Sequence, residues 1–285
     1  MPMNLDVVGV TGDTTTVSWT HKDAILYALG VGAGQDDPLT ELQYTTENSQ
    51  GVEQQMLPAY GVVLGMTYGK RPPLGDYPLS RVLHGEQSFV THRPLPVEGT
   101  ATVSSVVTGI YDKGKGALAV FDTVLADPAS GSPWLTSTTS LFIRGEGGFG
   151  GPAQQVPHWS VPHREADHEL TSTVRPDQTL LYRLSGDRNP LHSDPKFAQK
   201  AGFDRPILHG MCTYGVTGRL LVNALCDGDP TRVRSMSGRF SKPVMPGETL
   251  RVQIWDAGDR ALFRTISSDG SVVLDRGTFE FSGEL

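Results

Sequence analysis

The sequence of 285 residues has little cysteine, no long apolar run and a deficit of positive charge. Its two cysteines, Cys212 and Cys226, fall in or at the end of one expected helix. A rigid helix would hold their Cα atoms about 20 Å apart, which is far beyond the reach of a disulfide. Two cysteines are also too few for a cysteine-based zinc site. We therefore expect reduced core thiols.

The charge balance and the hydropathy pattern exclude other classes of protein. Lys and Arg number 24 against 31 Asp and Glu, giving a net charge of −7, and such a surface as a whole repels nucleic acid and anionic lipid. The sequence contains no stretch of about 18 consecutive apolar residues, so it predicts no membrane-spanning helix. The N-terminal segment carries Asp6 and Asp13 and lacks the apolar core of a signal peptide. We expect a cytoplasmic protein with neither a nucleic-acid nor a membrane partner.

Glycine and proline are plentiful, with 33 and 20 residues, which is typical of a folded chain with many turns. They concentrate near the midpoint, where residues 145–169 have many breakers and no apolar period. We interpret this segment as a linker. It divides the chain into an N-terminal half, residues 1–144, and a C-terminal half, residues 170–285.

The C-terminal half predicts an antiparallel sheet wrapped around a helix. Residues 207–225 form an apolar run with helical spacing and no proline, which predicts a buried helix. From Ser235 onward, segments rich in Val, Ile, Phe and Thr alternate with turns, which predicts four strands. Before the helix, the sequence predicts a short helix over 178–184, a structured loop over 185–194 and a helical turn over 195–201. This order indicates an α+β fold.

The N-terminal half repeats the pattern more faintly. Three short matches link the halves: Leu26-Tyr27-Ala28-Leu29 with Leu181-Tyr182-Arg183-Leu184, Leu83-His84-Gly85 with Leu208-His209-Gly210, and Arg93-Pro94 with Lys242-Pro243. Strand-like runs follow at 101–110, 117–125 and 134–143. We expect two copies of one helix-plus-sheet unit that pair through their sheets. The second match also places His84 and His209 at helix entrances, a structural role that we favour over acid–base chemistry.

Asp187 and His192 form the most informative pair of residues. Gly186 and Pro190 favour a bent loop that turns both side chains into one cavity. A carboxylate and an imidazole can hold one water molecule between them, and histidine exchanges protons near neutral pH. Gly210 opens the buried helix, where unpaired backbone N–H groups can stabilise a developing enolate. These residue types fit hydration chemistry.

A resemblance to a known family rests on these same segments. It is carried by Tyr182-Arg183-Leu184-Ser185-Gly186-Asp187-Arg188-Asn189-Pro190-Leu191-His192, His209-Gly210-Met211 and Arg239-Phe240-Ser241-Lys242-Pro243-Val244. Together they resemble the hydratase 2 motif of the MaoC-like (R)-specific enoyl-CoA hydratases. Tyr27–Gly32 and Val82–Gln87 resemble the N-terminal repeat of the long members of that family. The resemblance implies a double hotdog fold and reversible syn hydration of a trans-2-enoyl-CoA to the (3R)-3-hydroxyacyl-CoA.

The resemblance also implies roles for individual residues. Asp187 and His192 take the positions of the catalytic acid–base pair, and Asn189 that of a site-shaping residue. Gly210 takes the position of the glycine whose N–H binds the thioester carbonyl. The resemblance further implies a homodimer that acts on an acyl-CoA thioester without a metal or redox cofactor.

The match between Leu26-Tyr27-Ala28-Leu29 and Leu181-Tyr182-Arg183-Leu184 indicates that the N-terminal half has lost the catalytic pair. It places Gly32 opposite Asp187 and Gly34 opposite Asn189, in a loop without histidine. By the resemblance, a degenerate half leaves room for a bulky acyl tail, so we expect medium-to-long acyl chains.

Several alternatives remain open at this stage. Arg239 and Lys242 could neutralise the phosphates of CoA or simply be solvated. His158, His163 and His168 recur at a spacing that suits no metal site. The rival functions are an acyl-CoA thioesterase of the hotdog type and a non-catalytic acyl-CoA binding protein.

Overall fold

The computed structural model describes residues 3–156 and 158–283, which form one antiparallel sheet of ten strands. The strand order is β1-β3-β4-β5-β2-β7-β10-β9-β8-β6. The strands are β1 (Thr15–Trp19), β2 (Val82–Thr91), β3 (Gly99–Asp112), β4 (Gly116–Ala126), β5 (Pro133–Arg144), β6 (His168–Thr173), β7 (Val233–Phe240), β8 (Thr249–Asp256), β9 (Arg260–Ile266) and β10 (Val272–Phe281). The predicted strands at 101–110, 117–125 and 134–143 are confirmed, as are the four strands of the C-terminal half.

Each half of the chain contributes five consecutive strands to this sheet. The halves meet where β2 pairs with β7 in antiparallel register, so that Phe89 lies opposite Met236. Both side chains are buried on the face that carries the helices. The prediction that two similar units pair through their sheets is confirmed.

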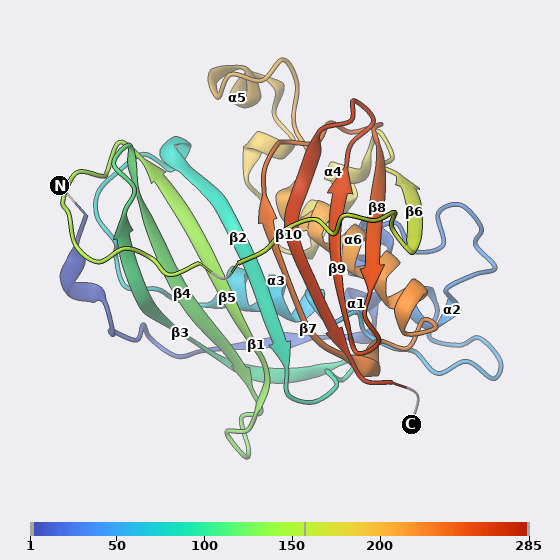
Figure 1. Cartoon of the computed structure of the whole chain (residues 1–285). Coiled ribbons are helices and arrows are strands. Elements are labelled where there is room, and N and C mark those ends of the chain that lie inside the picture. Colours follow the sequence, from blue (N-terminus) through green and yellow to red (C-terminus); the bar gives the residue numbers. More distant parts are fainter. Residues whose placement is uncertain (1–2, 157, 284–285) are drawn as a thin grey trace.

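The helices lie on one face of the sheet, except for α5, which stands beyond the ends of the strands (Figure 1). They are α1 (His21–Gly30), α2 (Leu42–Thr45), α3 (Ala59–Tyr68), α4 (Gln178–Tyr182), α5 (Pro195–Lys200) and α6 (Gly210–Leu225), with 3-10 turns at Leu5–Val7, Leu79–Arg81, Arg183–Ser185, Pro190–His192 and Pro230–Arg232. The central helix α6 is buried along most of its length, and its Tyr214 hydroxyl donates to the Met236 carbonyl of β7 over 2.8 Å. Across the described residues, no helix is both long and apolar enough to cross a bilayer.

The chain between β5 and β6 crosses the opposite face of the sheet (Figure 1). The Asp112 carboxylate accepts backbone N–H groups from Gly148 and Gly150, and the Trp159 indole donates to the Gly277 carbonyl over 3.1 Å. We call residues 145–156 and 158–167 the strap. Strand β6 begins at His168, so the last two residues of the expected linker belong to a strand.

One structural prediction for the N-terminal half is wrong. Leu83-His84-Gly85 lies within strand β2, and the helix equivalent to α6 is instead α3. Two glycines inside α3 hide its helical character in the sequence, because glycine is a weak helix former. The structure needs them, since a Cβ on Gly61 or Gly65 would lie 3.1 Å from a side chain of the sheet.

Candidate active site

A tightly bent loop follows α4 and leads to α6. Gly186 has a φ of +149°, and a Cβ there would collide with the side chain of Thr67 in α3. The Asp187 carboxylate accepts the Asn189 N–H over 3.0 Å, and the Asn189 side-chain oxygen accepts the Leu191 N–H over 3.1 Å. Each side chain thus fixes the turn that follows it.

His192 ends the next 3-10 turn and points into the protein. The residue is 7% exposed, and its Nδ1 lies 2.8 Å from the Ile207 carbonyl oxygen. Because a carbonyl only accepts, Nδ1 carries the proton and Nε2 presents its lone pair. Burial lowers the pKa of His192, against the opposing effects of the Ile207 carbonyl and the Asp187 charge. His192 is therefore a neutral base near pH 7.

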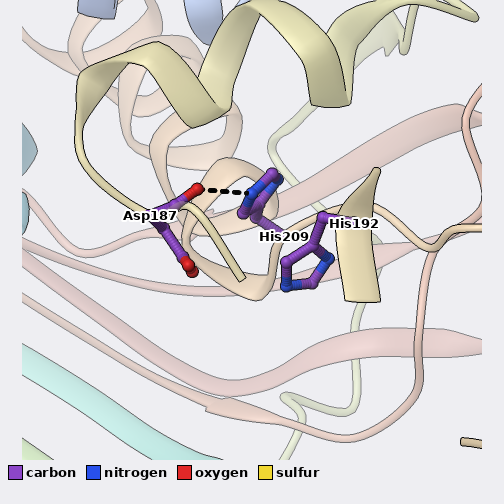
Figure 2. Close-up of side chains that lie close together, drawn as sticks. All are labelled: Asp187, His192 and His209. Atoms are coloured by element: carbon purple, nitrogen blue, oxygen red, sulfur yellow. Dashed lines mark hydrogen bonds between the residues drawn. The ribbon is translucent and has the colours of Figure 1, made fainter. Parts of the chain in front are cut away.

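His209, the residue before α6, packs directly against His192 (Figure 2). The ring centroids are 3.8 Å apart with planes inclined by 28°. His209 Nε2 lies 3.2 Å from the backbone carbonyl oxygen of Asp187. Burial and, secondly, the neighbouring His192 lower the pKa of His209 to about 2, so it remains neutral. The expected place of His209 at a helix entrance is confirmed, and it also links the loop to α6.

Three side chains meet at the start of α6: Asp187, His192 and His209. One possible metal-ligand atom from each, a carboxylate oxygen or a ring nitrogen, lies within 4.8 Å of the others. Nearly parallel, stacked rings direct their in-plane lone pairs side by side rather than toward one point. Metal ligation needs convergent lone pairs. The geometry is better suited to holding a small polar molecule between the exposed carboxylate and His192.

Gly210 is the first residue of α6, and its backbone N–H belongs to the helix turn that lacks intrahelical acceptors. A Cβ built on Gly210 would lie 3.3 Å from the Phe240 ring. That ring in turn contacts His84 of β2, with centroids 4.6 Å apart. A side chain at position 210 would therefore crowd the space in front of the helix. Glycine avoids this crowding, and Gly210 is partly exposed.

The two basic candidates lie apart from each other. Lys242 is exposed after β7 and donates to the Ser271 hydroxyl over 2.8 Å. Two residues later, the Val244 carbonyl accepts the Leu208 N–H just before α6. Arg239 precedes Phe240 on β7 and so points to the opposite face of the sheet, where it lies 4.0 Å from Glu86.

In the equivalent loop of the N-terminal half, Glu41 forms an ion pair with an arginine of α6, where the C-terminal half has a carboxylate beside an imidazole. Arg219 of α6 donates to both oxygens of Glu41, over 2.9 and 2.8 Å, and Asn223 donates to the same carboxylate over 2.6 Å. Arg219 pulls the pKa of Glu41 below its usual value despite burial, which acts in the opposite direction. Our sequence reasoning missed this pair. Arg219 was the available signal, because a charge in a buried helix needs a partner.

Comparison with known proteins shows the family of this chain. The model of the MaoC like domain matches residues 158–277, and that of the MFE-2 hydratase 2 N-terminal domain matches residues 17–145. The chain is 45% identical to 3-hydroxyacyl-thioester dehydratase Y of Mycobacterium tuberculosis, covering 99% of each sequence. It is 36% identical to the peroxisomal enoyl-CoA hydratase 2 of Arabidopsis thaliana, covering 88% of this chain and 86% of that one.

The solved structures agree with the sequence comparison. The MaoC-like dehydratase of Phytophthora capsici superposes with a TM-score of 0.89 at 32% identity, covering 99% of this chain and 98% of that one. The predicted double hotdog fold is confirmed. The protein belongs to the MaoC-like family, with an MFE-2 hydratase 2 N-terminal domain joined to a MaoC-like domain.

Proposed function

We propose that this protein is an (R)-specific enoyl-CoA hydratase, equivalently a 3-hydroxyacyl-CoA dehydratase. The observation that carries the proposal is the meeting of Asp187 and His192 at the open N-terminus of α6. It is supported by relatives named enoyl-CoA hydratase and 3-hydroxyacyl-thioester dehydratase at 36–45% identity. No redox chemistry is required, because water alone is added or removed.

In this mechanism the thioester carbonyl accepts a hydrogen bond from the Gly210 N–H. Water lies between the Asp187 carboxylate and His192 Nε2, and its oxygen forms the new bond to C3. The pair takes one proton from the water and delivers one to C2 on the same face, so the substrate gains one water in total. Negative charge that develops on the thioester oxygen is stabilised by the helix N-terminus. Asp187 and His192 share the protons as a coupled pair.

Asn189 has a shaping role in this proposal. Its side chain caps the 3-10 turn that carries His192, and its own N–H binds the Asp187 carboxylate. It therefore holds both members of the pair at a fixed separation.

We propose that the acyl tail of the substrate extends along α6. We also propose that the protein accepts acyl chains of medium to long length. A small apolar cavity of about 10 Å³, lined by Phe89, Gly215, Gly218 and Met236 among others, lies between α6 and the sheet. At 1.5 Å per residue, Gly215 lies roughly 7.5 Å along the helix axis from Gly210. A tail that reaches this depth must displace side chains, and the unbranched Met236 is the most adaptable of them.

Lys242 is proposed to neutralise phosphates of CoA. Two residues after Lys242, the Val244 carbonyl accepts the Leu208 N–H just before α6, at the end of the helix where we place the thioester. Arg239 was the other candidate for binding the phosphates of CoA. We do not assign it this role, because its side chain lies on the other face of the sheet, beside Glu86.

The test is to mix the purified protein with crotonyl-CoA and then with decenoyl-CoA. The ultraviolet absorbance of the conjugated thioester should fall, and chiral analysis should identify the (R)-hydroxyacyl product. Release of free thiol without hydration would indicate the thioesterase. Binding without either signal would indicate an acyl-CoA binding protein, and an (S) product would contradict the stereochemistry.

A homodimer and a cytoplasmic location complete the proposal. The sheet ends at β1 and β6, each paired on one side only within the described residues, and such edges are readily covered by association. Both cysteines are buried free thiols, as suits a reducing compartment. Light scattering should give twice the chain mass, and fractionation should recover the protein from the cytosol.

A further inference from the structure

A second pocket lies on the face of the sheet opposite the helices, underneath the strap. Its volume is about 300 Å³, which is at the lower end of the range for small-molecule sites. Strands β5, β2, β7, β9 and β10 contribute its floor and sides, and Trp159 of the strap forms part of its cover. It therefore spans the seam between the two halves, with the sheet separating it from Asp187 and His192.

The floor of this pocket is a row of hydroxyl groups. Ser88 lies opposite Thr138 on one side and opposite Ser237 on the other, and Ser237 lies opposite Thr278. The hydroxyls of Ser237 and Thr278 are hydrogen-bonded over 2.6 Å. Four strands thus place hydroxyls in register on one surface. The Thr138 hydroxyl donates to the Asp122 carboxylate over 2.6 Å. Hydroxyl hydrogens rotate, so Ser88 and one member of the Ser237–Thr278 pair can donate to an anion placed above the row.

Three arginines surround the hydroxyl row. Arg239, Arg260 and Arg276 line the pocket with Glu86 as the single acidic side chain, giving a net charge of +2 in a chain whose total is −7. Glu86 lies 4.0 Å from Arg239. Within the described part of the chain, Arg260 and Arg276 form no ion pair. The pocket therefore holds positive charge that an anionic ligand can neutralise.

Arg276 is held in place by an unusual backbone. It lies at an irregularity of β10 and has a φ of +53°, a conformation that residues other than glycine rarely adopt. The Trp159 indole donates to the carbonyl of the next residue, Gly277. The strap is thus fixed to the segment that directs Arg276 into the pocket.

We propose that this pocket binds a phosphate-bearing small molecule, as a site separate from the hydratase site. Guanidinium groups bind phosphate oxygens in paired hydrogen bonds, and the hydroxyl row supplies further donors. The Trp159 ring offers an aromatic surface for a planar group such as a nucleotide base. This assignment does not depend on the hydratase activity.

The test is calorimetric titration of the full chain with inorganic pyrophosphate and, separately, with ADP. We expect saturable binding that weakens as salt is added, with tighter binding of ADP if the base contacts Trp159. Arg276→Gly removes the guanidinium and suits the positive φ, so the fold should persist; binding should weaken at least tenfold. Arg234→Gln, an exposed arginine on β7 outside the pocket, is the control for total charge and should bind as the unmodified protein does.

Three results would overturn the proposal. The first is no binding of either probe at millimolar concentration. The second is an equal loss in Arg276→Gly and Arg234→Gln, which would indicate general charge attraction. The third is a raised KM of Arg276→Gly for an enoyl-CoA but not for the corresponding N-acetylcysteamine thioester. That result would make the pocket part of the substrate site.

Discussion

Replacing Asp187 with Asn tests the proposed acid–base pair with the smallest change in shape. The amide retains an oxygen that can accept the Asn189 N–H, now at 3.0 Å, so the loop should keep its conformation. It loses the negative charge and the ability to take up a proton. A positioned acid or base contributes about 10²- to 10⁴-fold in rate, which corresponds to about 3–5 kcal/mol of barrier. The turnover number should fall by that factor.

The effect on stability should be small. The side chain of Asp187 is exposed, and surface substitutions usually change the free energy of unfolding by less than about 0.5 kcal/mol. Thermal unfolding of Asp187→Asn should therefore match the unmodified protein. This separates a catalytic effect from a folding defect.

The assay is the rate of enoyl-thioester hydration, with Asp194→Asn as the matched control. Asp194 lies seven positions later and caps α5, and asparagine caps a helix equally well. The same chemical change in the same region should leave the rate within about twofold, since it removes no proposed catalytic group. The reasoning fails if Asp187→Asn keeps more than roughly a tenth of the activity, or if both variants lose it equally.

Other predictions address the helix N-terminus, the ion pair and pH. Gly210→Ala should lower kcat/KM by roughly ten- to hundredfold by pressing on Phe240 and crowding the carbonyl site, measured with crotonyl-CoA. Glu41→Gln should destabilise the protein by about 3–5 kcal/mol in urea unfolding, because it leaves Arg219 buried without a counter-charge. His209 binds a proton near pH 6.5 when unfolded but only near pH 2 when folded, so stability should fall as pH drops below 6.5. This residue alone should cost about 2 kcal/mol at pH 5, and urea unfolding of His209→Gln should show a weaker pH dependence.

The second half of the chain is more predictable from sequence than the first. Its strands alternate apolar and polar residues between clear Pro-Gly and Asp-Gly turns, and its central helix is a continuous apolar run. In the first half, α3 contains glycines that pack against the sheet and reduce its helical signal. Local propensity and tertiary packing disagree there, and packing decides the structure.

The error at His84 has a specific cause. A His-Gly pair carries no conformational preference strong enough to identify a helix, whereas the alternating burial of Gln87, Phe89 and Thr91 is typical of a strand. The candidate site residues Asp187 and His192 could be predicted from the sequence, because Gly186 and Pro190 impose a bend on the loop that carries them. The contact of His209 with both of them depends on how α6 meets the loop, which no local pattern encodes.

Helix α6 explains why one half can carry the site while the other half supports it. Its N-terminus brings His209 and Gly210 to the loop that carries Asp187. Farther along, Arg219 donates to the Val31 carbonyl and to Glu41, within the loop that would have carried the equivalent pair. Gly32, which aligns with Asp187, lies against the same arginine, since a Cβ there would be 3.4 Å from Arg219 Nη2. A larger side chain at position 32 would therefore crowd the guanidinium that binds Glu41, and the helix that forms the proposed active site also constrains this loop of the N-terminal half.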